Sequence, residues 1–200
     1  MRRKTMPIGL LALAILLFSF VAPQTQKDLK PGDILFQDSF SRQSQAIKLA
    51  THSEFSHVGI LFKKDGKLQV LEGVQPVKYT PLDQWIRHGK NNSYKVKRLK
   101  DRTLSSTELA KMQRYGEQLL NKDYDIFFNW SNDQIYCSEL VWKIYKEGAG
   151  IELCPTKKLK SFDLDHAIVK TIMKERYGNN VPYEEPVVAP SDLYDSSLLE

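Results

Sequence analysis

Short apolar runs and helically spaced apolar positions alternate along most of the chain. The first short run, PGDILFQD at 31–38, begins with a Pro-Gly pair and predicts a strand. Two further runs within 56–74 flank KKDGK, and an Asp-Gly pair between apolar runs is typical of a β-hairpin. Residues 94–99, YKVKRL, alternate between polar and apolar and predict another strand. The pattern therefore predicts several short strands, two of them joined by a tight turn.

Two short helices are predicted among these strands. Residues 41–51 carry small apolar side chains at helical spacing, which predicts a short amphipathic helix. In 79–89, Thr80 fits the N-cap, Pro81 the first helical position and Gly89 the stop. We therefore expect the second helix to begin at Pro81 and to end before Gly89.

Two longer helices follow. Residues 104–122 begin with Ser105 and Glu108, the spacing of a capping box, and continue with an apolar stripe that is typical of core packing. Residues 137–150 also carry apolar side chains at helical spacing and end in a glycine-rich stop. Cys137 is expected at or near the N-terminus of this helix.

The last part of the chain predicts one more helix and an extended tail. We expect the helix within 161–178, capped by Asp163 or Asp165. The final residues, 179–200, are rich in Pro and acidic residues, and we expect them to cover the surface as extended chain. Short strands, a hairpin and separate helices, without a regular strand-helix repeat, predict an α+β fold.

The N-terminus has the layout of a secretory signal. A basic run at 1–7 precedes an apolar run from Ile8 to Ala22 that is shorter than a typical transmembrane helix. Cleavage after Ala22 would leave Phe20 where a small residue is preferred, so an uncleaved membrane anchor stays open. We predict a signal peptide or anchor at 1–24, one folded domain at 25–200, and export to the periplasm or cell envelope.

Charge excludes one class of partner. The chain of 200 residues carries a formal net charge of +5, and Arg2, Arg3 and Lys4 supply three of these charges, which leaves +2 for the rest. A small net charge on an exported domain does not support binding to nucleic acid. The remaining charges are most simply a solvated surface.

Three residues suggest a nucleophilic site. A thiol at a helix N-terminus beside a histidine becomes a reactive thiolate, and this is the environment expected for Cys137. His57 opens an apolar strand, where it would be held rigidly as a base. Glu72, on the partner strand of the hairpin, would orient the far nitrogen of the imidazole. An unpaired buried carboxylate is costly, so Glu72 in an apolar strand requires a partner.

Other interpretations of these residues stay open. A cysteine in an apolar helix is usually inert packing, and a lone histidine is usually a satisfied, half-buried side chain. A disulfide between Cys137 and Cys154 is permitted by export, although a helix of roughly 16 Å between them at ~1.5 Å per residue leaves little chain for the return. We therefore expect Cys154 to be a free thiol. The spacing of the histidines and cysteines predicts no metal site, and the pattern implies no cofactor.

At this point the motifs carry a resemblance that covers nearly the whole exported part. PGDILFQ, SQAIKLATHSEFSHVGIL, EGVQPVKYTPLDQWI, YDIFFNWSNDQIYCSELVWK and ERYGNNVPYEEPVVAPSDL resemble the YiiX-like group of circularly permuted NlpC/P60 proteins, which are papain-like cysteine hydrolases. The resemblance implies a permuted papain-like fold, with an antiparallel sheet packed against a helix that carries the nucleophile. It also implies that Cys137 is the catalytic cysteine, His57 the base and Glu72 the third member.

Four more residues receive supporting roles from this resemblance. Tyr136 lies beside the nucleophile, Asp33 lies in the Gly-Asp turn, His52 precedes the base, and Tyr124 opens the aromatic-rich YDIFFNW. His52 is expected to serve the turn before His57 or to line the cleft. The aromatic segment is expected either to line the cleft or to pack in the core.

Three functions follow as hypotheses. The favoured one is an exported cysteine amidase or peptidase that acts on a cell-wall peptide or small amide through a thioester acyl-enzyme. The second is a lipid-directed thiol acyltransferase or lipase with an acyl-lipid substrate. The third is a non-catalytic binding protein on the same fold, which an unreactive Cys137 would support.

Overall fold

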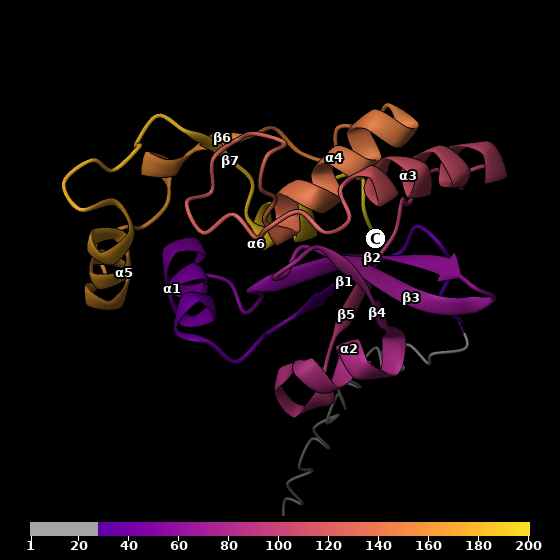
Figure 1. Ribbon diagram of the computed structural model, residues 1–200, viewed down its shortest axis with the longest axis horizontal. Helices are drawn as coiled ribbons and strands as arrows, with labels where there is room; N and C mark the ends of the chain where they lie inside the picture. Colours follow the sequence, from indigo (N-terminus) through magenta and orange to yellow (C-terminus); the bar gives the residue numbers. More distant parts are fainter. Residues whose placement is uncertain (1–27) are drawn as a thin grey trace, which may run out of the picture.

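The structure is a computed structural model that describes residues 28–200, so the predicted export segment at 1–24 lies outside the described residues. Figure 1 shows a central sheet with helices on both faces and a lobe of two helices at one side. Within 28–200 no helix combines the length and the apolar character needed to cross a bilayer.

Five strands form one sheet in the order β4-β3-β2-β1-β5, and every neighbouring pair is antiparallel. The α+β fold with an antiparallel sheet is thus confirmed. The strands of this sheet are β1 (Ile34–Gln37), β2 (His57–Lys64), β3 (Lys67–Glu72), β4 (Lys78–Pro81) and β5 (Lys95–Lys97). A separate two-stranded ribbon pairs β6 (Lys157–Lys158) with β7 (Pro186–Val187).

The helices are α1 (Arg42–Thr51), α2 (Leu82–His88), α3 (Ser106–Gln118), α4 (Cys137–Ala149), α5 (Ala167–Tyr177) and α6 (Pro190–Tyr194), with single 3₁₀ turns η2 (Lys90–Asn92) and η3 (Leu159–Ser161). The capping box predicted for α3 is present: Ser105 Oγ accepts from the N–H of Glu108, and the Glu108 carboxylate accepts from the N–H of Ser105.

The hairpin of β2 and β3 turns where the sequence predicted. Lys64 pairs with Lys67, so Asp65 and Gly66 form a two-residue loop. Both loop residues have positive φ, 51° and 77°, the combination that the favoured hairpin turns require. This turn fixes the register that places Gly59 opposite Glu72.

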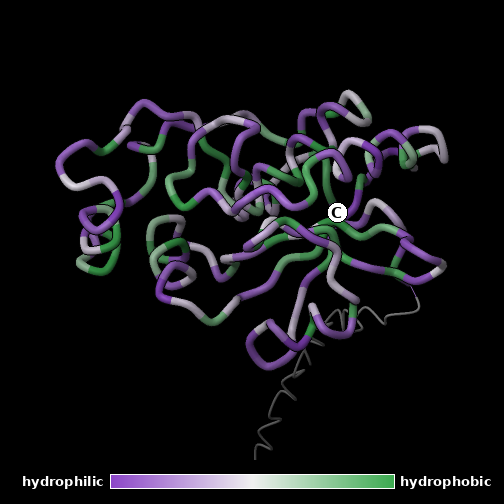
Figure 2. The backbone as a smooth tube through the Cα atoms, viewed as in Figure 1, coloured by the Kyte–Doolittle hydropathy of each residue, from purple (hydrophilic) through white to green (hydrophobic). Residues whose placement is uncertain are grey.

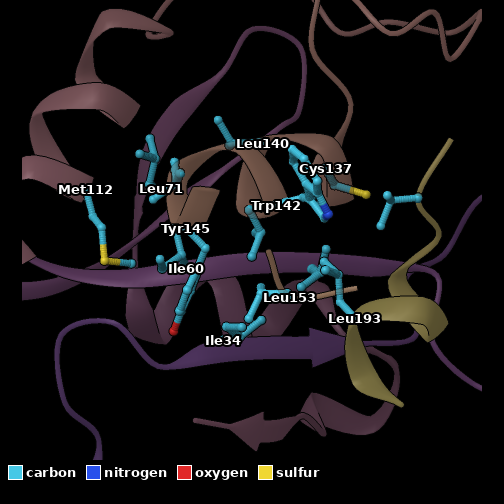
Figure 3. Close-up of a cluster of buried hydrophobic side chains, with 14 of the residues drawn as sticks. Ile34, Ile60, Leu71, Met112, Cys137, Leu140, Trp142, Tyr145, Leu153 and Leu193 are labelled. Carbon is cyan, nitrogen blue, oxygen red and sulfur yellow. The ribbon is translucent and has the colours of Figure 1, made fainter. Parts of the chain in front are cut away.

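The sheet has a different helix layer on each face. Strand residues such as Ile34, Ile60 and Leu71 pack with α4 and α3 in the main core, which Figure 3 shows in close-up. Leu35 and Leu61, which alternate with them, belong to a second cluster against α2. Figure 2 shows hydrophobic stretches along the strands and more hydrophilic segments toward the outside.

The lobe of α1 and α5 has a small cluster of its own. Ala46 of α1 packs with Val169 and Ile172 of α5, and the two helices lie together at one side of the molecule (Figure 1). Arg42 of α1 also pairs with Glu175 of α5 at 2.9 Å on the surface. Two helices more than a hundred residues apart in the sequence therefore form one lobe.

Two predicted helix starts are wrong by a few residues. Thr80 is not a cap: it lies in β4, α2 begins at Leu82, and the Thr80 hydroxyl donates to a carboxylate of the site. The cap of α5 is neither Asp163 nor Asp165 but His166, whose Nδ1 accepts from the N–H of Ile168. Thr80 is taken by Glu72 of the neighbouring strand, and Asp163 lies against His52 at the end of α1, so partners from the tertiary fold override these two signals. Asp165 instead pairs with Lys170 of α5.

The tail is not extended surface chain as predicted. It contains β7 and α6, and Val188, Leu193 and Leu199 are buried in the main core. The helix α6 begins with Pro at its first position, and the N–H of Ala189 donates to the Asp192 carboxylate at 2.7 Å. This start signal, Pro followed by an acid, was outweighed in the sequence by the tail's overall composition.

Candidate active site

Cys137 is the first residue of α4, as the sequence predicted. Cys137 is 2 % exposed. Figure 3 shows it at the edge of the core cluster, with its sulfur directed away from Leu140 and the residues beyond it. The first N–H groups of a helix have no partner within the helix, and its dipole favours a negative charge at this end. A thiolate and the oxyanion of a tetrahedral intermediate are both stabilised by such a position.

Gly73 brings the sheet against this helix end. A Cβ built on Gly73 would lie 2.9 Å from both the Cα and the N of Cys137, and 2.9 Å from the carbonyl carbon of Tyr136. Real Cβ atoms do not approach backbone this closely, so only glycine fits here. Because Gly73 directly follows Glu72, the end of β3 is held beside the start of α4.

His57 and Glu72 form a buried pair at the same end of the sheet. The Nε2 atom of His57 lies 2.6 Å from Oε2 of Glu72, and the two residues are 9 % and 2 % exposed. They are diagonal neighbours across β2 and β3, a spacing that long side chains bridge. With Nε2 directed to the carboxylate, Nδ1 is the nitrogen left for the hydrogen bond between the His57 ring and the Cys137 thiol.

Thr80 completes the environment of the carboxylate. Thr80 is 1 % exposed, and its hydroxyl donates to Oε1 of Glu72 at 2.5 Å. Both carboxylate oxygens are therefore hydrogen-bonded, one to the imidazole and one to the hydroxyl. The ring of Trp85 from α2 lies beside the imidazole, with centroids 6.2 Å apart, and limits its movement.

The electrostatics favour an ion pair between Cys137 and His57. Burial disfavours the charged imidazolium, but the hydrogen bonds and charges of Cys137 and Glu72 outweigh it and raise the pKa of His57 to about 10. Burial likewise disfavours the thiolate, but the His57 ring and the N–H of Val58 lower the pKa of Cys137 below its ordinary value. The pKa of Glu72 is also lowered, because its hydrogen bond with His57 outweighs burial.

Tyr124 meets Cys137 from the other side. Its hydroxyl is in hydrogen-bonding contact with the Cys137 sulfur, and it accepts a hydrogen bond of 2.8 Å from Nε2 of Gln43. Burial and the charge of the thiolate raise the pKa of Tyr124 well above its ordinary value, so the phenol keeps its proton. The sequence singled out Tyr124 only as a supporting residue; this contact makes it a hydrogen-bond donor at the reacting sulfur.

The other predicted supporting residues lie apart from this contact. Tyr136 is buried next to Cys137 in the wall of the site, where its hydroxyl accepts from the N–H of Val188. Asp33 pairs with Arg98 at 2.8 Å and does not line the cavity beside Cys137. His52 ends α1 with a positive φ of 50°, so it serves the turn before β2, and it is too exposed to act as a buried base.

A largely apolar cavity opens onto Cys137. It encloses about 730 Å³ of empty space, including its open mouth, and the nucleophile lies in its wall. Small and aliphatic side chains of α1 and α5 form one part of its lining, with Gln43 and Arg176 as polar members. The rest comes from the start of α4, the loop before it, the segment around η3 and the tail. Its lining includes Ala46, Ile47, Ala50, Val169, Ile172, Met173, Val187, Val188 and Tyr124.

Sequence reasoning missed Thr80, Gln43 and this cavity. The signal at Thr80 was assigned to a helix cap, and Gln43 is one polar residue of an amphipathic helix. Only the tertiary structure shows that α1 and α5, which pack against each other, also contribute apolar side chains to a cavity beside Cys137.

The two cysteines are not bonded to each other, as expected. Cys154 is half-buried, and burial raises its pKa to about 12, which leaves it an unreactive thiol. Among residues 28–200, His, Cys, Asp and Glu do not gather in any group of three or more that would hold a metal ion.

Comparison with known proteins shows which family this sequence is similar to. The sequence model for permuted papain-like amidase enzymes of the YaeF/YiiX type, the C92 family, matches residues 28–200. The chain is 47 % identical over 168 residues to the protein YiiX of Escherichia coli K12, covering 84 % of this chain and 83 % of that protein.

The fold also resembles a solved structure. A crystal structure of yiiX from Escherichia coli O157:H7, described there as a metalloprotein, superposes with a TM-score of 0.83 at 47 % identity. It covers 86 % of this chain and 94 % of that one. The described part of this chain offers no ligand set that fits a resident metal of the kind that this description implies.

Proposed function

The chain belongs to the permuted papain-like amidase family, a family of cysteine amidase-type hydrolases, and from this premise we propose that Cys137, His57 and Glu72 form its catalytic triad. The observation that carries the proposal is their convergence. A histidine with one nitrogen on a buried carboxylate interacts with a cysteine at a helix N-terminus, and this cysteine lies with Tyr124 in the wall of one cavity.

The reaction follows from these positions. The Cys137 thiolate attacks the carbonyl carbon of an amide, and the carbonyl oxygen gains the negative charge. The N–H groups at the start of α4 and the Tyr124 hydroxyl stabilise this oxyanion. The His57 imidazolium then gives its Nδ1 proton to the leaving nitrogen, the carbon-nitrogen bond breaks, and a thioester remains on Cys137.

Water completes the cycle. The neutral imidazole takes a proton from water, which attacks the thioester, and the carbon-sulfur bond breaks as the free acid leaves, which restores the Cys137 thiolate and the His57 imidazolium. Glu72 stays ionised throughout and holds the ring in one tautomer, with Thr80 fixing the carboxylate.

The cavity supports one class of substrate. An apolar space next to the nucleophile favours an amide or peptide whose acyl side carries an apolar group, such as an acylated amine, over a strongly polar cell-wall peptide. The same observation supports the second candidate, lipid-directed acyl transfer, in which an amine or alcohol replaces water as the acceptor.

We further propose that the domain acts after export in the periplasm or cell envelope, and that an uncleaved N-terminal segment would tether it to the membrane. The basic run and apolar run at 1–22 support this location. Cell fractionation, with mass spectrometry of the mature N-terminus, would test it; recovery of the full chain in the cytosolic fraction would contradict it.

The triad is tested by trapping the acyl-enzyme. The protein would be mixed with N-acyl amides of increasing chain length, quenched in acid and measured by intact mass. We expect an acyl adduct on Cys137 that is absent from Cys137→Ala, together with release of free acid. Transfer of the acyl group to an added amine or alcohol in preference to water would favour the acyltransferase. If Cys137 forms no adduct with any amide or ester, the binding-protein hypothesis replaces both.

A further inference from the structure

Two side chains outside the proposed triad form a hydrogen-bonded chain that ends at the nucleophile. Nη2 of Arg176 on α5 donates to Oε1 of Gln43 on α1 at 2.5 Å, and Nε2 of Gln43 donates to the hydroxyl of Tyr124 at 2.8 Å. Tyr124 and Cys137 lie in the wall of the same cavity, and the Tyr124 hydroxyl interacts with the Cys137 sulfur. This hydrogen-bonded chain therefore runs from Arg176 in the wall of the cavity to the sulfur of Cys137.

The direction of every hydrogen bond in this chain follows from its first member. A guanidinium has only donors, so the group of Gln43 that faces Arg176 must be its oxygen. The amide nitrogen of Gln43 then faces Tyr124 and donates to the phenol oxygen. With that lone pair occupied, the phenol's own hydrogen is left to point at the Cys137 sulfur.

The alternative arrangement shows what Arg176 contributes. If the amide of Gln43 turned round, its oxygen would accept the Tyr124 hydrogen, and the hydroxyl would no longer donate to the sulfur or to an oxyanion. Arg176 opposes this rotation, because it would bring an N–H group against the guanidinium. Arg176 is itself held over the Phe128 ring, with the guanidinium carbon 5.3 Å from the ring centre.

We propose that Gln43 and Arg176 are positioning residues that keep the Tyr124 hydroxyl donating toward Cys137. The inference rests on the proposed role of Cys137 and adds two residues, from α1 and α5, that act through Tyr124. Because both line the apolar cavity, the donor at the nucleophile is set by the same two helices that would enclose the substrate.

The sharpest variant is Gln43→Glu. A carboxylate keeps its contact with Arg176 and gains an ion pair, but it can only accept, so it draws the Tyr124 hydrogen away from the sulfur. A purely structural role predicts little harm from this change. Our proposal predicts that Gln43→Glu and Tyr124→Phe each slow alkylation of Cys137 by iodoacetamide at mildly acidic pH by about tenfold, the worth of one charge-assisted hydrogen bond.

A double-mutant cycle separates the hydrogen bond from the added charge. In the Tyr124→Phe background, Gln43→Glu retains only the effect of its charge on the thiolate, so its cost must shrink. Arg176→Ala must likewise lose most of its effect in that background. Full additivity of either pair would overturn the proposal.

The chain provides matched controls on the same helices. Arg42→Ala removes a second arginine contact between α1 and α5, the pair with Glu175, without touching Tyr124. Gln45→Glu places the same new charge at an exposed position of α1. Both controls should leave the alkylation rate unchanged, and thermal melting of each variant reports its folding.

The two levels of the proposal fail differently. If Cys137 of the unmodified protein alkylates like an ordinary free thiol, the proposed nucleophile itself is wrong. If Cys137 is reactive and His57→Ala removes that reactivity, but Gln43→Glu behaves like Gln45→Glu, the triad stands and the positioning role of Gln43 and Arg176 is wrong.

Discussion

At the scale of single residues, the site is a set of donors and acceptors whose protonation is fixed by contact. His57 holds Glu72 with one nitrogen and faces Cys137 with the other, and the two anionic partners together raise the pKa of His57 to about 10. The same contact lowers the pKa of Cys137, which favours a thiolate beside an imidazolium.

The first prediction concerns pH. Since the pKa of Cys137 is lowered, its thiolate forms below the pH at which a free thiol ionises; since that of His57 is raised, its proton is retained until about pH 10. Amidase activity should therefore rise with pH as Cys137 ionises and fall as His57 loses its proton, giving a bell with a basic limb near pH 10. His57→Ala should move the pH dependence of Cys137 alkylation upward, because the strongest influence that opposes burial is then lost. An unchanged alkylation profile would contradict the ion pair.

The second prediction concerns Thr80. Thr80→Val keeps the shape of the side chain but leaves Oε1 of Glu72 without its hydroxyl donor. We expect kcat/KM for an amide substrate to fall by about tenfold, because the carboxylate orients the imidazole less well. Thr171→Val is a suitable comparison, since that hydroxyl bonds only to the backbone of its own helix. Equal effects of the two changes would argue against a role for Thr80 at the site.

At the scale of elements, the site depends on the meeting of three ends. The start of β2, the end of β3 and the start of α4 bring His57, Glu72 and Cys137 together, and alternate side chains of the strands give their other face to the core. No one of these elements contains the site. Its geometry is set by how closely the helix approaches the sheet.

The third prediction tests that approach at Gly73. Gly73→Ala places a methyl group 2.9 Å from the backbone of Cys137, which must displace the start of α4 from β3. A shift of about 1 Å is expected to reduce activity by about a hundredfold. Gly116→Ala provides the control, because its methyl group would crowd the side chains of Leu71 and Ile144, away from the nucleophile.

These two variants should differ in what they damage. Gly116→Ala is expected to lower the melting temperature while the folded protein keeps its rate of Cys137 alkylation. Gly73→Ala is expected to lose that rate even where the protein remains folded. Normal reactivity of Cys137 in Gly73→Ala would show that the close approach is not needed.

At the scale of the whole molecule, two separately packed parts of the structure lie next to Cys137. The sheet with α3 and α4 holds the proposed triad, and the lobe of α1 and α5 encloses the cavity beside it. The tail from β7 through α6 runs between them and buries Val188 and Leu193 in the core. The proposed triad therefore lies on the sheet and α4, while α1 and α5 contribute to the wall of the cavity and, through Gln43 and Arg176, hold the Tyr124 hydroxyl.

The fourth prediction follows from this division. Ala50→Phe should fill part of the cavity, and Met173→Ala should enlarge it, while neither residue belongs to the triad. Since each buried methylene is worth about 0.8 kcal/mol, we expect the preference for an octanoyl over an acetyl substrate to fall by at least about tenfold in Ala50→Phe. Met173→Ala should favour longer chains, and rates with acetyl substrates should stay within about twofold in both. If the preference for octanoyl over acetyl substrates is the same in both variants as in the unmodified protein, the acyl group binds outside this cavity.

The sequence by itself determined the strands β1, β2, β3 and β5, the hairpin turn, the capping box of α3 and the position of Cys137 at the start of α4, because each depends on neighbours within a few residues. It also selected His57 and Glu72, since a charged residue in an apolar strand requires a partner. Thr80, Gln43 and Arg176 were beyond its reach, because their roles depend on partners on other elements, up to 133 positions away.

Local signals failed where a distant partner was stronger. Thr80 was expected to cap a helix but donates to Glu72, and the acidic tail was expected at the surface but buries its apolar residues. The cavity shows the same limit, since the apolar faces of α1 and α5 predict burial, and only the arrangement of these helices with the start of α4 and the tail decides whether space remains. Sequence pattern therefore fixed which residues could react, and tertiary packing decided what surrounds them.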